Sequence, residues 1–97
     1  ISATPSDTFF GVQLTGTSLA MTMDVPDQGI AFYSIGRLDD DTASWSGAVE
    51  IHDGAYNDNT GSSHHAVYEY TTETTGFVET ATFQNSLAHK GAAAVWK

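Results

Sequence analysis

The stretch SWSGAVEIHD, residues 44–53, carries the clearest two-residue alternation in this chain. Trp45, Gly47, Val49 and Ile51 fall on one side of an extended backbone, and the residues between them fall on the other side. The pattern predicts a half-buried antiparallel strand with one solvated face. A tryptophan at the head of the apolar row buries more surface than almost any other side chain, so we predict Trp45 as the centre of the core.

Shorter alternating runs lie on both sides of this stretch, and turn-forming Gly, Pro, Asn and Asp residues separate them. These runs predict further strands at residues 8–14, 18–25, 29–36, 64–72, 77–83 and 92–97. About seven short strands without a convincing helix indicate an all-β protein, a single antiparallel β-sandwich or jelly roll. A short helix over residues 86–94 is the competing prediction there, because leucine and alanine favour helices.

The length of 97 residues is that of one domain. We assign the sandwich to residues 8–97 and predict an N-terminal arm or linker over residues 1–7, where no periodicity is present. The chain starts with Ile1 rather than methionine, so we expect a processed product or a piece of a longer polypeptide.

The charge is strongly negative, with 12 Asp and Glu against 3 Lys and Arg, for a formal net charge of −9. Such a chain repels nucleic-acid phosphates and anionic membrane surfaces, so neither is an expected partner. Cysteine is absent, which excludes disulfides, thiolate metal ligands and a cysteine nucleophile. No apolar run approaches the length that spans a bilayer, so membrane insertion is not expected.

Metal-ligating residue types occur in two places. His52, Asp53 and His64 flank the loop between two predicted strands and would suit zinc, copper or nickel, although solvent-facing histidines are the alternative. His64 and His65 are adjacent in a strand and should point to opposite faces. Asp39 and Asp41 lie in an acidic loop whose oxygen ligands would suit calcium, with solvated turn residues as the alternative. Otherwise we predict no cofactor.

We predict no enzymatic activity, because the nucleophile motif Gly-x-Ser-x-Gly and a paired acid and base are both missing from the sequence. Glu50, Glu69, Glu73 and Glu79 are predicted to point outward from strands or turns. A carbohydrate site is the alternative function, since an exposed aromatic ring beside amide and carboxylate groups can bind sugars. Its predicted residues, in the loop 54–63, are Tyr56, Asn57, Asp58 and Asn59.

The segments AFYSIG (31–36), WSGAVEIHDG (45–54) and AVYEY (66–70) resemble the β-sandwich domains of viral surface proteins, such as phage tail-fibre tips and capsid decoration proteins. The resemblance rests on strand rhythm over the middle half of the chain. It implies a cofactor-free structural or adhesive module, located in a virion or otherwise extracellular, that binds neighbouring subunits or host glycans and forms homo-oligomers. The candidate interface residues are Phe9, Phe10, Phe32, Tyr33 and Trp96.

Overall fold

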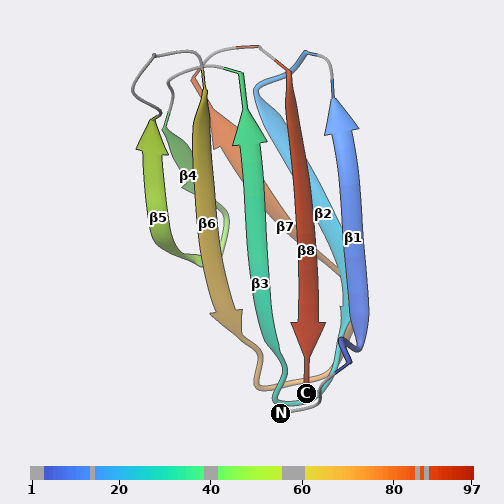
Figure 1. Ribbon diagram of the computed structural model, residues 1–97. Coiled ribbons are helices and arrows are strands. Elements are labelled where there is room, and N and C mark those ends of the chain that lie inside the picture. The colour runs from blue at the N-terminus through green and yellow to red at the C-terminus, as the bar shows by residue number, and fades with distance from the viewer. Residues whose placement is uncertain (1–3, 14, 39–41, 56–60, 85, 87) are drawn as a thin grey trace.

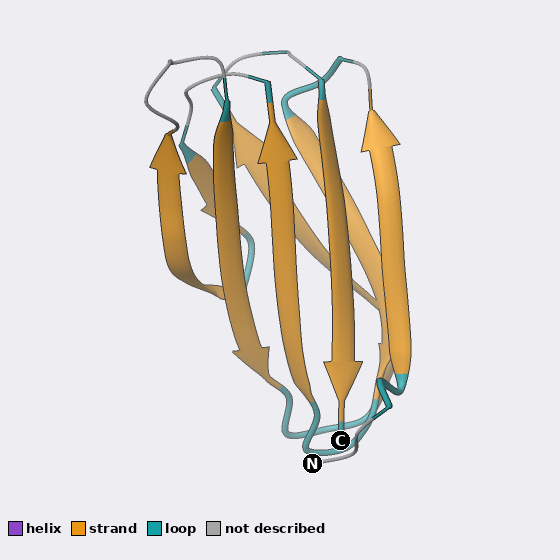
Figure 2. Cartoon of the chain, viewed as in Figure 1, coloured by secondary structure: helices purple, strands orange, loops and turns teal. Residues whose placement is uncertain are grey.

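The computed structural model describes residues 4–13, 15–38, 42–55, 61–84, 86 and 88–97. These residues form eight strands and no helix (Figure 2). The strands are β1 (Asp7–Gln13), β2 (Ser18–Val25), β3 (Ile30–Arg37), β4 (Ala43–Trp45), β5 (Val49–Ala55), β6 (Ser62–Glu69), β7 (Thr74–Phe83) and β8 (His89–Trp96). The all-β prediction is confirmed, and the helix considered for residues 86–94 is wrong because β8 occupies most of that range.

The strands form two sheets that stack face to face (Figure 1). One sheet has five strands in the order β1-β8-β3-β6-β5, and the other has three in the order β2-β7-β4. Antiparallel pairing joins β1 with β8, β2 with β7, and β3 with β6. Each of these strands of the first half therefore pairs with the strand at the matching position counted back from the C-terminus. This pairing is the topology of a jelly roll, with β5 joined to β6 instead of β4.

The core lies between the sheets and is built from alternate residues of each strand. In β2 the predicted row of Leu19, Met21, Met23 and Val25 is buried, while the residues between them are exposed. Tyr33 is the largest fully buried side chain and lies near the centre of this core. Trp45 is only partly buried and packs against Tyr33, with ring centroids 6.1 Å apart, so the prediction of Trp45 as the core centre is wrong.

The predicted strand over residues 44–53 is divided between the two sheets, which is the main correction to the sequence analysis. Residues up to Trp45 belong to β4 in the three-stranded sheet, and Val49 begins β5 in the five-stranded sheet. The side chains of Val49 and Ile51, predicted to be buried, are 64% and 55% exposed. Two short strands in different sheets therefore produced an alternation that looked like one strand.

The segment that crosses between the sheets is held by Glu79 of β7. Its carboxylate accepts hydrogen bonds from the Ser46 hydroxyl (2.9 Å) and from the backbone N–H groups of Gly47 (2.9 Å) and Ala48 (3.0 Å). Glu79 has 0% exposure, so its predicted outward orientation is wrong. The backbone N–H groups of Gly47 and Ala48 no longer have a neighbouring strand to bond after β4 ends, and the Glu79 carboxylate accepts their hydrogen bonds instead.

The five-stranded sheet begins slightly earlier in the chain than predicted. The Ser6 N–H donates to the Val95 carbonyl at 2.7 Å, and Asp7 already belongs to β1. The sheet therefore includes the last residue that we assigned to the arm.

Candidate functional site

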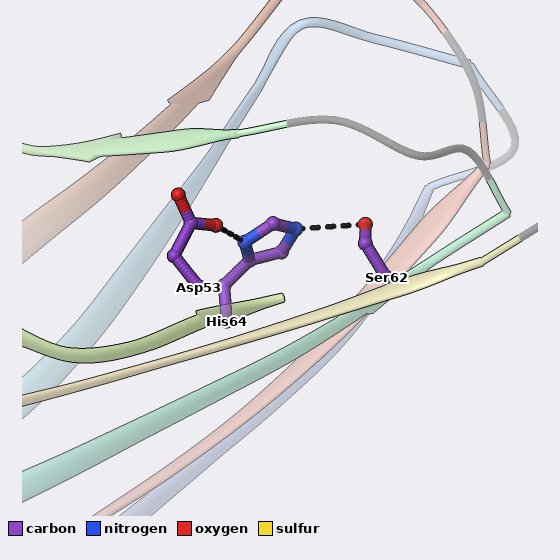
Figure 3. Close-up of polar contacts among 3 residues, drawn as sticks. All are labelled: Asp53, Ser62 and His64. Atoms are coloured by element: carbon purple, nitrogen blue, oxygen red, sulfur yellow. Dashed lines mark hydrogen bonds and ion pairs between the residues drawn. The ribbon is translucent and has the colours of Figure 1, made fainter. Parts of the chain in front are cut away.

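A buried polar network occupies the inner side of β5 and β6 near the end of the sandwich (Figure 3). His64 pairs with Asp53 across the two strands, and Ser62 lies two residues before His64 on the same face. The His64 Nδ1 contacts the Asp53 carboxylate, and Nε2 lies 2.9 Å from the Ser62 hydroxyl. In the tautomer that carries its proton on Nδ1, Nδ1 donates to the carboxylate and Nε2 accepts a hydrogen bond from the Ser62 hydroxyl.

The order of groups in this network is that of a serine nucleophile, a base and an orienting carboxylate. Ser62 and His64 both have 0% exposure, however, so a substrate carbonyl cannot reach the serine oxygen in this conformation. The Asp53 side chain is also largely covered, at 18% exposure. The contact of Asp53 with His64 joins β5 to β6, and the network gives hydrogen-bond partners to polar groups that burial would otherwise leave unpaired.

The Ser62→Ala variant tests this assignment. We expect its free energy of unfolding to fall by about 1 kcal/mol, because His64 Nε2 loses a buried partner. Ser63→Ala, on the opposite face of the same strand, is the matched control and should change stability by less than about 0.5 kcal/mol. Denaturant unfolding measures both values. Hydrolysis of p-nitrophenyl acetate by the wild type that disappears in Ser62→Ala would contradict a purely structural role.

The residues predicted to bind a metal do not form one cluster. Asp53 and His64 lie on the inner face of the sheet, whereas His52 lies on the outer face beside His65, with ring centroids 5.3 Å apart. Among the described residues, no group of three or more His, Cys, Asp or Glu side chains is placed to hold a metal ion. Asp39 and Asp41 fall outside the described residues, so calcium at that loop stays a prediction.

The opposite orientations predicted for the adjacent histidines are confirmed. His64 is buried, and His65 is partly exposed and packs against the ring of Phe32 at a centroid distance of 5.6 Å. Burial and the nearby His52 and His64 lower the pKa of His65 from its usual value. His65 therefore favours its neutral state.

The residues predicted to bind sugar, Tyr56, Asn57, Asp58 and Asn59, lie outside the described residues. That alternative function stays a prediction. Before these residues β5 ends at Ala55, and after them β6 begins at Ser62.

A second buried polar group, which the sequence analysis missed, adjoins the network. Arg37 lies 4.0 Å above the ring of Phe83, and its Nη1 lies 3.2 Å from His89 Nδ1. Both polar residues are almost fully buried, and an adjacent hollow of about 360 Å³ is lined in part by Ser62, Leu38 and both of them. The alternation within β8 places His89 on the inner face with Gly91 and Ala93, which is the signal that could have identified it.

The outer surface of the five-stranded sheet is the most distinctive exposed feature, and we call it the outer face. Strand register places the following described residues on it: Thr8, Phe10 and Val12 of β1; Lys90, Ala92, Ala94 and Trp96 of β8; Ile30, Phe32, Ser34 and Gly36 of β3; Ser63, His65, Val67 and Glu69 of β6; and Val49, His52 and Gly54 of β5.

The outer face gathers most of the large exposed hydrophobic side chains of the described residues. Five of the eight large exposed hydrophobic side chains in the described part of the chain lie on it, and Phe10 is 71% exposed. Of the predicted interface residues, Phe10, Phe32 and Trp96 belong to this face. Phe9 and Tyr33 do not: Phe9 packs against the core and Tyr33 is fully buried, because each alternates with an outward neighbour.

Searches for similar proteins found no protein-family model, curated protein or solved structure that matches this chain. The fold and the surface therefore define its class from their own geometry: a jelly-roll β-sandwich with a buried polar network and an uncovered apolar sheet face. Within the described residues, no helix has the length and apolar character needed to cross a membrane.

Proposed function

We propose that this chain is a non-enzymatic structural or adhesive module of a virion or another extracellular assembly, and that it acts through contacts made by the outer face. The observation that carries the proposal is the concentration of exposed Phe, Ile and Val side chains on that face. Contiguous apolar patches larger than a few hundred Å² are rare on monomeric proteins, and the largest patch on a protein is often an interaction surface.

The charge distribution supports the same proposal. The chain carries 12 acidic residues, but Glu69 is the one acidic residue that strand register places on the outer face among those described. Protein interfaces are depleted of charge at their centres, since each charge must lose its hydration when the surfaces meet. The remaining acidic surface repels other negatively charged molecules, including further copies of this chain, and so disfavours their contact elsewhere.

The burial of Ser62 and His64 supports the non-enzymatic part of the proposal, because the most catalytic-looking arrangement in the described residues has no access for a substrate. A stable surface of fixed shape, and not a reactive group, is then the useful property of the fold.

A double variant, Phe10→Asp with Phe32→Asp, tests the proposal by placing two charges in the outer face. In sedimentation velocity from about 1 to about 200 µM, we expect the wild type to associate and the variant to stay at the monomer mass of 10.3 kDa. Val78→Asp is the matched control, because Val78 is 48% exposed on the outer side of the three-stranded sheet. A wild type that stays monomeric over the whole range would count against the proposal.

A further inference from the structure

We infer that the occupant of the outer face is the outer face of a second copy of this chain, turned end over end about a two-fold axis that runs across the strands. This inference rests on the proposed function and names its partner. In such a contact the same patch is used by both copies, and the assembly closes at two subunits.

The two charges of the outer face lie at its opposite ends. Lys90 shares a row of the sheet with Val12 and Gly36, while Glu69 shares the row at the other end with Ile30. Both side chains are exposed. A two-fold axis across the strands exchanges the two ends, so Lys90 of each copy comes to the end that holds Glu69 of the other. The two residues then lie two strands apart across the sheet, and their long side chains bring the charges toward the distance of about 10 Å over which charges interact in salt.

The overall charge favours this face for self-contact. Each copy carries a net charge of −9, so two copies repel one another through most surfaces. The outer face combines one lysine and one glutamate with neutral side chains, and its formal charge is zero when its two histidines are neutral. Two copies of this acidic chain can therefore contact one another through the outer face without bringing many negative charges close together.

The size of the face is near what a stable dimer needs. Five strands about 4.8 Å apart, each rising about 3.3 Å per residue over seven or eight residues, give a surface of about 600 Å². Stable interfaces bury about 800 Å² of accessible surface on each partner, and the accessible surface of this face exceeds its flat area because side chains project from it.

The alternation of small and large side chains on the outer face also allows a second sheet to pack against it. Small side chains at Ser34, Ala92 and Ala94 lie between the larger rings of Phe10 and Phe32 in adjoining rows. Two such sheets can stack about 10 Å apart with their large and small side chains interleaved, as the inner faces of a sandwich do.

Charge reversal tests the two-fold arrangement. We expect Lys90→Glu and Glu69→Lys each to raise the dimer dissociation constant about three- to tenfold, and the double variant to return it to within about threefold of the wild type. Sedimentation equilibrium gives these constants, and the wild-type assembly should have twice the monomer mass of 10.3 kDa.

Glu69→Lys separates a specific pairing from a net-charge effect, because it changes the net charge from −9 to −7. A general relief of repulsion would tighten association, whereas the proposed pairing weakens it. Glu73→Lys makes the same change at an exposed residue outside the outer face, and it should leave the constant unchanged or slightly lower.

The outcomes distinguish this inference from the proposed function. A trimer or larger assembly, or a double charge reversal that does not restore affinity, overturns the two-fold dimer while association through the outer face still stands. A wild type that remains monomeric overturns both. Circular dichroism spectra that match the wild type establish that each variant is folded.

Discussion

Glu79→Ala should lower the free energy of unfolding by about 3–5 kcal/mol, the largest effect that we expect from a single substitution in this chain. The truncation removes the acceptor for the Ser46 hydroxyl and for the N–H groups of Gly47 and Ala48. These donors belong to the segment that crosses between the sheets, and they are directed at the carboxylate of a residue with 0% exposure. Each donor left without a partner carries a desolvation penalty.

Thermal and denaturant unfolding measure this effect, and for a domain of this size the midpoint temperature falls by about 4–8 °C for each kcal/mol. Glu79→Gln keeps the shape and one acceptor oxygen but places an NH₂ group near backbone N–H donors, so it should cost about 1–3 kcal/mol. Glu73→Ala is the control at an exposed glutamate and should cost less than about 0.5 kcal/mol. A loss below about 1 kcal/mol in Glu79→Ala would show that the crossing does not depend on this carboxylate.

Gly91→Ala should lower the free energy of unfolding by about 1–3 kcal/mol, because the inner face of β8 has no room for a side chain at this position. A Cβ atom at this position would lie 2.5 Å from Leu19 Cδ2, 3.3 Å from Ile35 Cγ1 and 3.5 Å from Met21 Sδ. All three neighbours are buried core residues, so none can move away without displacing others.

Gly36→Ala is the matched control for this variant. Gly36 pairs with Lys90 in the same sheet but faces outward, and a Cβ atom there would meet nothing within 4 Å. We expect its stability to be unchanged or raised by up to about 1 kcal/mol, since alanine restricts the unfolded chain more than glycine does. Equal losses in both variants would indicate a general requirement for glycine in these strands and contradict the packing explanation.

Tyr33, predicted as an interface residue, lies in the core, where its hydroxyl group pairs with that of Tyr70. The Tyr33 and Tyr70 hydroxyl oxygens are 2.5 Å apart, and burial raises the pKa of both groups above the usual tyrosine value. Each ring therefore has a polar partner inside the sandwich and needs no contact with solvent or another chain. The alternation in residues 29–36 puts an aromatic residue on each face of the strand, Phe32 on one and Tyr33 on the other. It does not indicate which of the two faces is buried by the second sheet.

The candidate site was predictable only in part. Strand parity alone separated His64 from His65, and the structure confirms that they face opposite sides. The contact of His64 with Asp53 depends on the register of β5 against β6, which includes a shift between Glu50 and His52. Such a bulge changes which residues share a face, and the sequence carries no clear mark of it.

Glu79 shows a similar limit. Its parity with Ala81 and Phe83, both buried, was available in the sequence as a weak sign that it points inward. Its three donors come from a segment more than thirty residues earlier in the chain, and only the crossing from β4 to β5 brings them to it.

The sequence by itself determined that this is an all-β chain of short strands, and it determined which residues of strands such as 18–25 share a face. These properties follow from the local geometry of an extended backbone, in which neighbouring side chains point in opposite directions. Only the tertiary structure decided that residues 44–53 divide between two sheets, that Glu79 and His64 are buried, and that the outer face is left uncovered. Those outcomes depend on which distant strands pair and in what register. The face of a strand becomes buried only when strands from other parts of the sequence pack against it.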